Sequence, residues 1–287
     1  MNKDDRMNYT EIDWNLVWQK LYNDNLNCRG TNDCASIWAS KEKARSFMQQ
    51  SRENPERIRH VIDGLPIHSG SRVLDIGAGP GTMAVPIAKI AAHVTAVEPS
   101  PGMTSVLTEY AEEEGVSNIQ VIPKRWEDID LSSDLDGQYD VVVASYSLGM
   151  PDIKDAVSAM CRASSDWVYL FWFADTTNWE QAMIDLWPKL HGREYRRGPK
   201  ADILFNLLYS MGIYPNVETA DMDHVRRFPD IAAALEEYRD QYGIQTPEQE
   251  AILMEYLKGS LVKNGDQFIQ SGMTKRVKIW WRVNGCQ

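Results

Sequence analysis

Three alternating glycines directly after an apolar run restrict the folds open to this chain. The segment reads Val73-Leu-Asp-Ile-Gly-Ala-Gly-Pro-Gly-Thr82, and a helical pattern follows it. Glycine is needed where a backbone turns sharply and where a ligand approaches main-chain atoms, because a Cβ would obstruct both. A strand, a glycine turn and a helix in this order predict the ligand-binding crevice at the carboxyl ends of a parallel sheet.

Short β-branched runs alternate with helical patterns from Arg72 onward, which is typical of a parallel sheet covered by helices on both faces. Strands are expected at residues 72–76, 93–98, 119–123, 139–144, 166–173, 216–225 and 275–283. Helices are expected at about residues 81–90, 101–114, 153–163, 201–211, 231–242 and 247–262. The chain is therefore predicted to form a doubly wound α/β fold with seven strands.

Segments outside this alternation are predicted to be additions to the α/β domain, which spans residues 71–287. Residues 1–70 are interpreted as a helical N-terminal cap, because their apolar residues have helical spacing at Trp14, Val17, Trp18 and Leu21. The aromatic and basic stretch at about 175–200, after the fifth strand, is interpreted as an insertion. A helical insertion is expected at about 228–265. The cap and the 175–200 insertion together are predicted to form a lid that excludes water.

The charge balance argues against a nucleic-acid substrate. The chain has 41 acidic and 30 basic side chains, which gives a net charge of −11. A charge of this sign repels polyphosphate backbones unless a basic patch overrides it locally. We therefore expect a small-molecule substrate.

Apolar runs and cysteines indicate a cytoplasmic protein without a membrane span. The longest apolar run, Trp167–Ala174, has 8 residues, whereas a membrane helix needs roughly 20. The first residues contain no apolar stretch of the kind found in a secretory signal. The 4 cysteines are scattered without a CxxC pair, as expected under reducing conditions, and no metal site is predicted.

Two carboxylates are expected beside the glycine turn. Asp75 comes two residues before the first glycine, where it would face a cationic amine or sulfonium and repel a phosphate. Glu98 ends the second predicted strand, where a carboxylate can accept hydrogen bonds from both ribose hydroxyls. A nucleoside with a positively charged tail suits both acids.

The segment Asp75-Ile-Gly-Ala-Gly-Pro-Gly81 closely resembles the first motif of the class I, Rossmann-like S-adenosylmethionine-dependent methyltransferases. The resemblance implies a last strand that is antiparallel, S-adenosylmethionine as methyl donor and S-adenosylhomocysteine as product. It further implies that Glu98 holds the ribose, that residues 99–103 and the loop after the third strand contact the adenine, and that the fourth strand ends beside the methyl group. The cofactor-binding residues expected on this basis are Asp75, Gly77, Ala78, Gly79, Glu98, Pro99, Met103, Trp126, Glu127 and Ser145.

Two other functions stay open. The segment Gly79-Pro-Gly-Thr-Met-Ala84 also satisfies the GxGxxA form of the nicotinamide fingerprint, with Glu98 19 residues after Gly79. An NAD(P)-dependent oxidoreductase is therefore an alternative, although Asp75 disfavours a pyrophosphate at this turn. Methylation of a protein side chain is the second alternative to a small-molecule acceptor.

The acceptor side has weaker signals. Methyl transfer is an in-line displacement, for which a base is optional, and Tyr146 is the candidate catalytic residue. Aromatic rings near the predicted mouth could enclose a planar or apolar acceptor, and Trp179 and Tyr195 are candidates. Arg196 and Arg197, in the basic stretch before residue 200, could bind an anionic group of the substrate.

Overall fold

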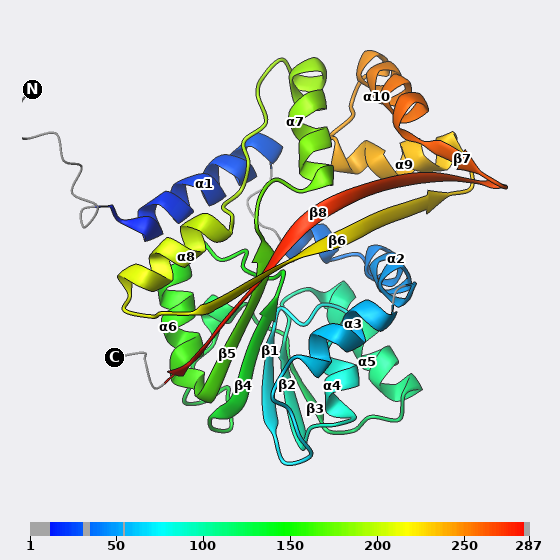
Figure 1. The fold of residues 1–287 in the computed structure, drawn as a ribbon. Coiled ribbons are helices and arrows are strands. Elements are labelled where there is room, and N and C mark those ends of the chain that lie inside the picture. Colours follow the sequence, from blue (N-terminus) through cyan, green and yellow to red (C-terminus); the bar gives the residue numbers. More distant parts are fainter. Residues whose placement is uncertain (1–11, 31–34, 54, 284–287) are drawn as a thin grey trace, which may run out of the picture.

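Five parallel strands form the centre of the sheet in the computed structural model, which describes residues 12–30, 35–53 and 55–283 (Figure 1). They are β1 (Arg72–Ile76), β2 (His93–Val97), β3 (Ile119–Ile122), β4 (Tyr139–Ser145) and β5 (Ser164–Phe173). Two longer strands, β6 (Asn216–Phe228) and β8 (Gln267–Arg282), extend the sheet in the order β3-β2-β1-β4-β5-β8-β6, and the short β7 (Val262–Asn264) pairs with β8. Since β8 runs antiparallel to both β5 and β6, the predicted mostly parallel sheet with an antiparallel last strand is confirmed.

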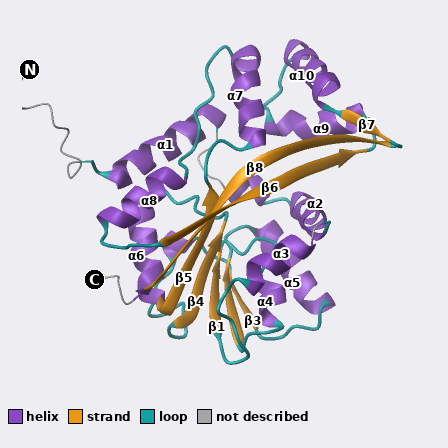
Figure 2. Ribbon diagram, viewed as in Figure 1, coloured by secondary structure: helices purple, strands orange, loops and turns teal. Residues whose placement is uncertain are grey.

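Helices cover both faces of this sheet (Figure 2). One face packs against α1 (Trp14–Arg29), α6 (Ile153–Ala163) and α8 (Ala201–Ser210). The other packs against α3 (Pro55–Asp63), α4 (Ala84–Ala88) and α5 (Pro101–Glu113). Consecutive residues of β1 alternate between the two cores, and all but the first are buried, which explains its nearly continuous apolar sequence. Helix α4 is shorter than predicted because the left-handed glycines before it cannot belong to a helix.

The N-terminal helices pack against the domain. Trp18 of α1 is fully buried in the core of the sheet, and its indole Nε1 donates a hydrogen bond of 2.9 Å to the carbonyl oxygen of Met150. Helix α2 (Lys41–Arg52) packs on α5 through a small apolar cluster. The parts of the predicted 1–70 cap at residues 1–11, 31–34 and 54 lie outside the described residues. Each helix within the described ranges is too short or too polar to cross a membrane.

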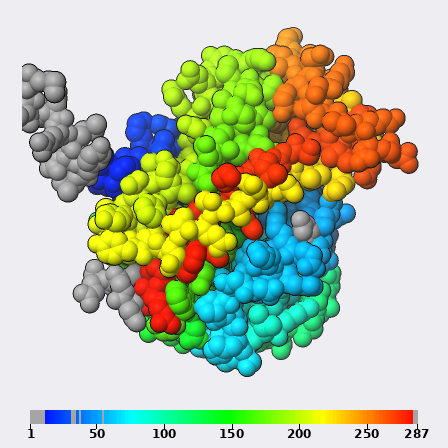
Figure 3. All heavy atoms as spheres, viewed as in Figure 1, coloured from blue at the N-terminus to red at the C-terminus, as the bar shows by residue number. Residues whose placement is uncertain are grey.

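Strands β6 and β8 continue beyond the sheet as a two-stranded ribbon (Figures 1 and 3). Residues 276–282 of β8 pair with β5, whereas residues 268–275 pair with residues 221–228 of β6 and, at the far end, with β7. The far part of the ribbon packs with three helices around an apolar core of its own, separate from the two cores on the faces of the sheet. These helices are α7 (Asn178–His191), α9 (Ile231–Gln241) and α10 (Pro247–Ser260). We call this ribbon segment with α7, α9 and α10 the roof.

Candidate active site

The three glycines after β1 have different surroundings. Their φ angles of 68° at Gly77, 56° at Gly79 and 85° at Gly81 all lie in the left-handed region. A Cβ on Gly77 would lie 2.3 Å from the Cβ of Ser147, and one on Gly81 would lie 3.0 Å from Leu107. A Cβ on Gly79 would meet no atom within 4 Å. Gly77 and Gly81 thus allow close packing, while Gly79 leaves room in front of the backbone.

Asp75 is buried without a charged partner. Its side chain is 2% exposed, and the Oδ2 atom makes no hydrogen bond within the described residues. Burial, followed by repulsion from Glu98, raises the pKa of the Asp75 carboxyl to about 7. A buried polar atom without a partner is costly for the fold and is characteristic of ligand sites. A cationic group of a ligand would satisfy this oxygen.

Glu98 links the glycine turn to the loop after β2. One of its carboxylate oxygens accepts a hydrogen bond of 2.9 Å from the backbone N–H of Gly79, and the other accepts one of 2.8 Å from the N–H of Ser100. Burial raises the pKa of Glu98, and these two hydrogen bonds oppose the shift. Each oxygen retains a further lone pair for a ligand hydroxyl.

The segment after the short helix at residues 35–38 lies against the start of α5, a contact that the sequence did not indicate. The Ser100 hydroxyl donates a hydrogen bond of 2.5 Å to the carbonyl oxygen of Trp38. A Cβ on Gly102 would lie 2.7 Å from the same carbonyl oxygen, so only glycine permits this approach. Residues 38–40 are therefore held against the loop and helix start that follow Glu98.

The residues expected to contact adenine have different environments. Pro99 is half-buried and Glu127 is exposed. Met103 packs between α2 and α5. Trp126 is 3% exposed and belongs to the sheet core, where its Nε1 donates a hydrogen bond of 3.0 Å to the carbonyl oxygen of Ala156 on α6.

Tyr146, directly after β4, has a strained backbone. It is the one non-glycine residue with positive φ, 56°, among the described residues. Such conformations cost about 1–3 kcal/mol and persist mainly at functional sites. The next residue, Ser147, contacts Gly77 and donates a hydrogen bond to the carbonyl oxygen of Ile76, so this turn lies beside the glycine turn. The preceding Ser145 is half-buried at the end of β4.

A row of rings leads from Tyr146 to the roof. Tyr146 stacks on Phe173 of β5 with ring centroids 5.0 Å apart, and Phe173 contacts Trp179 of α7 edge-on at 5.3 Å. Trp179 in turn lies 4.9 Å from the ring of His224 on β6. Burial, with the charges of Arg226 and Arg57, lowers the pKa of His224 to about 4, so this imidazole is neutral at pH 7. The structure thus brings two predicted acceptor-side residues, Tyr146 and Trp179, into one wall.

Two arginines that the sequence analysis did not select act on the same wall. Arg276 of β8 pairs directly with Phe173 across the antiparallel ladder, so both side chains lie on one face of the sheet. Burial raises the pKa of the Tyr146 hydroxyl, and the positive charge of Arg276, the close approach of its guanidinium to this hydroxyl and the charge of Arg57 oppose the shift. The hydroxyl itself makes no hydrogen bond of good geometry with the described residues. Only the pairing register of distant strands reveals this arrangement.

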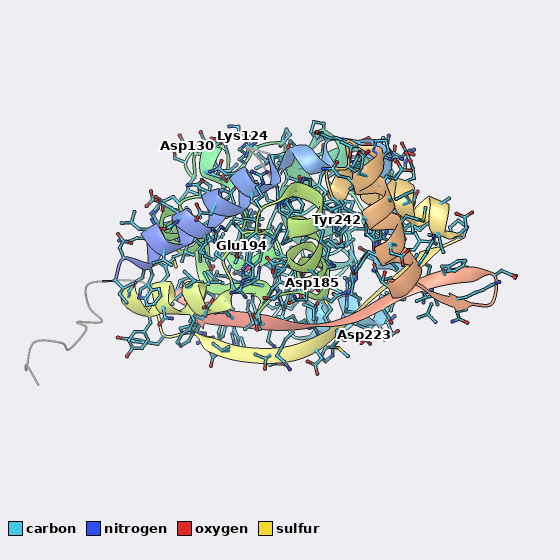
Figure 4. The ribbon with its side chains drawn as sticks, turned by 90° about the horizontal axis from the view of Figure 1, so that it is seen from above. Lys124, Asp130, Asp185, Glu194, Asp223 and Tyr242 are labelled. Carbon is cyan, nitrogen blue, oxygen red and sulfur yellow. The ribbon has the colours of Figure 1, made fainter. Side chains whose placement is uncertain are left out.

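The other predicted acceptor residues lie elsewhere. The Tyr195 hydroxyl accepts a hydrogen bond of 3.1 Å from Asn25 of α1, and its ring packs on Trp187. Arg196 lines a surface hollow of about 540 Å³ between α1 and the segment around Glu194, which Figure 4 labels near α1. Arg197 donates a hydrogen bond of 2.8 Å to the Thr176 hydroxyl. These three side chains are not in the aromatic wall.

Comparisons with known proteins address the class of enzyme. Residues 73–165 match the family model of a methyltransferase domain. An uncharacterized protein of Haemophilus influenzae is 26% identical over 230 residues, which are 79% of this chain and 81% of that protein. The crystal structure of the YcgJ protein from Bacillus subtilis shares the fold, with a TM-score of 0.51 and 15% identity, over 77% of this chain and 97% of that one.

Shorter matches name different acceptors. A ribosomal RNA small subunit methyltransferase A of Desulforapulum autotrophicum is 30% identical over 86 residues, 30% of this chain and 29% of that protein. A ubiquinone biosynthesis O-methyltransferase of Methylocella silvestris is 34% identical over 80 residues, 22% of this chain and 31% of that protein. In both cases the match covers less than a third of the relative's length.

Taken with the sheet order and the glycine turn, the family match defines a class I methyltransferase domain. The match indicates an enzyme that carries a methyltransferase domain at residues 73–165. The nicotinamide-dependent alternative suggested by Gly79–Ala84 is therefore set aside. The nature of the acceptor is a separate question.

Proposed function

We propose that this enzyme transfers the methyl group of S-adenosylmethionine to a small-molecule acceptor. The observation that carries the donor side is the open space in front of Gly79, between the buried unpartnered oxygen of Asp75 and the carboxylate of Glu98. The donor supplies a methyl group already activated on sulfur, so the chain contributes alignment and exclusion of water. The bond from the methyl carbon to sulfur breaks as the acceptor atom bonds to that carbon, and sulfur keeps the electron pair.

The donor is held, in this proposal, by groups around the glycine turn. Asp75 faces the positively charged end of the ligand, the backbone of Gly77–Gly79 lies along it, and Glu98 accepts hydrogen bonds from the ribose hydroxyls. Pro99 borders the adenine. The burial of Met103 and Trp126 in separate cores favours a supporting role, in which each fixes its loop by packing instead of contacting the base.

Tyr146 is proposed to position the acceptor. Its raised pKa keeps the phenol protonated at neutral pH, which disfavours a role as general base. A protonated hydroxyl that donates to no described residue can donate a hydrogen bond to the acceptor. Ser145, at the end of the same strand, lies on the donor side of this group. A proton displaced from the acceptor would leave to solvent.

A small acceptor is favoured over RNA or a protein by the surroundings of the aromatic wall. The roof ribbon and α7 contribute His224 and Trp179 to this wall, so the acceptor side is bordered by the roof as well as by the sheet. The net charge of −11 disfavours a polyanionic partner. Many basic side chains on the described surface are also paired with carboxylates, as Arg45 is with Glu109 and Arg52 with Glu113.

A labelled donor tests this proposal. The purified chain would be incubated with S-adenosylmethionine carrying a labelled methyl group and, separately, with a metabolite extract, total ribosomal RNA and an unfolded protein extract. We expect label in the metabolite fraction only, and much less of it with the Asp75→Asn variant at a donor concentration below saturation. Label in RNA or protein, but not in metabolites, would show that the acceptor proposal is wrong while leaving the donor site intact.

A further inference from the structure

Arg276 places a positive charge on the acceptor side without a carboxylate bound to it. No ion pair among the described residues includes Arg276, although it lies near enough to Glu218 to lower the pKa of that carboxyl. Glu218 is itself paired with Lys278 at 2.6 Å. A half-buried guanidinium without its own counter-ion is unusual in a chain with a net charge of −11.

The groups around Arg276 could form a binding surface. Phe173 is its direct cross-strand partner, and Tyr146 stacks on Phe173 with a buried hydroxyl that lacks a hydrogen bond of good geometry. Trp179 continues the apolar wall from Phe173. An unpaired cation, a phenol that can donate and a row of rings are suited to a molecule with an anionic end and an apolar body.

The two sides of the site also carry opposite charge. The donor side has two buried carboxylates, Asp75 and Glu98. On the acceptor side the charges of Arg57 and Arg276 act on Tyr146, and the neighbouring His224 is neutral at pH 7. The donor side therefore presents negative charge to a cationic donor, and the acceptor side presents positive charge to the acceptor.

We infer that the acceptor carries a small anionic group, a carboxylate or a phosphate, which Arg276 binds beside the Tyr146 hydroxyl while the apolar part lies against Phe173 and Trp179. Guanidinium groups bind both kinds of anion in a forked geometry. Arg57 adds positive charge to the same region. This inference rests on the proposed function, because it assigns the substrate class of that site.

Neutral and anionic probes of one shape test the inference. Benzoate, phenyl phosphate and the uncharged benzamide would be titrated by calorimetry into the chain saturated with S-adenosylhomocysteine. We expect at least one anion to bind about tenfold or more tightly than benzamide, a difference of about 1.4 kcal/mol, because only an anion forms a charge-assisted hydrogen bond with the guanidinium. Preference for benzoate assigns a carboxylate, and preference for phenyl phosphate assigns a phosphate. Equal binding of all three probes to the unmodified chain would overturn the inference.

Variants locate the anion site. Arg276→Gln should abolish the preference for the anion, and Arg276→Lys should retain part of it. Lys275→Gln is the matched control, because Lys275 is the exposed neighbour on β8 and pairs with Asp221 at 2.8 Å. An anion preference that survives in Arg276→Gln would also overturn the inference. Binding of S-adenosylhomocysteine is measured first in each protein, so failure of the donor site is seen separately from loss of anion selectivity.

Discussion

Replacing Asp75 by Asn should make the chain more stable at neutral pH and less able to bind its donor. The pKa of this carboxyl is about 7 in the folded chain, against an ordinary value of 3.8. Between these values Asp75 is ionised in the unfolded chain but protonated in the folded chain. Stability is therefore lost as the pH rises from 3.8 to about 7. The difference between the two pKa values corresponds to about 4 kcal/mol at pH 8, and Asn avoids this loss because it does not ionise.

Urea unfolding at two pH values measures the effect. The variant should exceed the parent in free energy of unfolding by about 1–2 kcal/mol at pH 5 and by about 4 kcal/mol at pH 8. Asp202→Asn, at an exposed position on α8, controls for the loss of one negative charge. Calorimetry should show affinity for S-adenosylhomocysteine reduced about tenfold or more. A stability difference that does not grow between pH 5 and pH 8 would refute the reasoning about burial.

Further predictions concern the glycine turn, the Trp126 core and the donor's pH dependence. Gly77→Ala should lower the free energy of unfolding by about 3–4 kcal/mol, from left-handed strain and overpacking, in urea titrations. Gly212→Ala, with φ of 77° and no atom within 4 Å of an added Cβ, should lower it by only about 1–2 kcal/mol. Gly79→Ala should match Gly212→Ala in stability but weaken binding of S-adenosylhomocysteine at least tenfold in calorimetry; unchanged affinity would contradict the open-space argument. Trp126→Phe should cost about 1 kcal/mol of stability and leave that affinity unchanged, whereas a large loss of affinity would restore a direct contact with the base. Affinity of the unmodified chain should fall as the pH drops below about 7, because Asp75 becomes protonated; a flat profile would contradict this.

The grouping of Asp75, the glycine turn and Glu98 was predictable because these residues are local in sequence. Asp75 and the glycines follow one strand within a few positions, and Glu98 ends the next strand along the chain. Parallel strands bring their carboxyl ends to one edge, so the order of the elements is enough to group these residues. The backbone conformation required of Gly79 followed from the same argument.

The acceptor half depends on long-range pairing that the sequence does not reveal. Arg276 reaches Phe173 only through the register of β8 against β5, and His224 reaches Trp179 only because the ribbon passes α7. The predicted last strand began at Lys275, since residues 267–274 are largely polar and carry no clear apolar alternation.

Trp126 and the segment at residues 175–200 show two further differences between the sequence analysis and the structure. Trp126 was expected to contact the adenine, and that contact stays a prediction. The structure shows that its indole N–H donates to the Ala156 carbonyl oxygen of α6, a pairing that the sequence did not indicate. The segment at residues 175–200 was interpreted as an insertion without assigned structure, yet it contains α7. Thr177 caps this helix by accepting a hydrogen bond from the N–H of Glu180. This capped helix start lies within a stretch rich in aromatic residues, where an apolar helical pattern is hard to distinguish.

The continuous ladder between β6 and β8 also limits how substrates can enter. A roof joined to the sheet by flexible loops could rotate as a rigid body about a hinge. Here, however, 13 consecutive residue pairs between β6 and β8 run from the sheet edge to Phe228 and Phe268. A ribbon of this kind can move only by bending or twisting, and such a deformation would also displace β5, the strand that pairs with β8. Because Phe173 is the last residue of β5, a movement of the ribbon would also shift the aromatic wall.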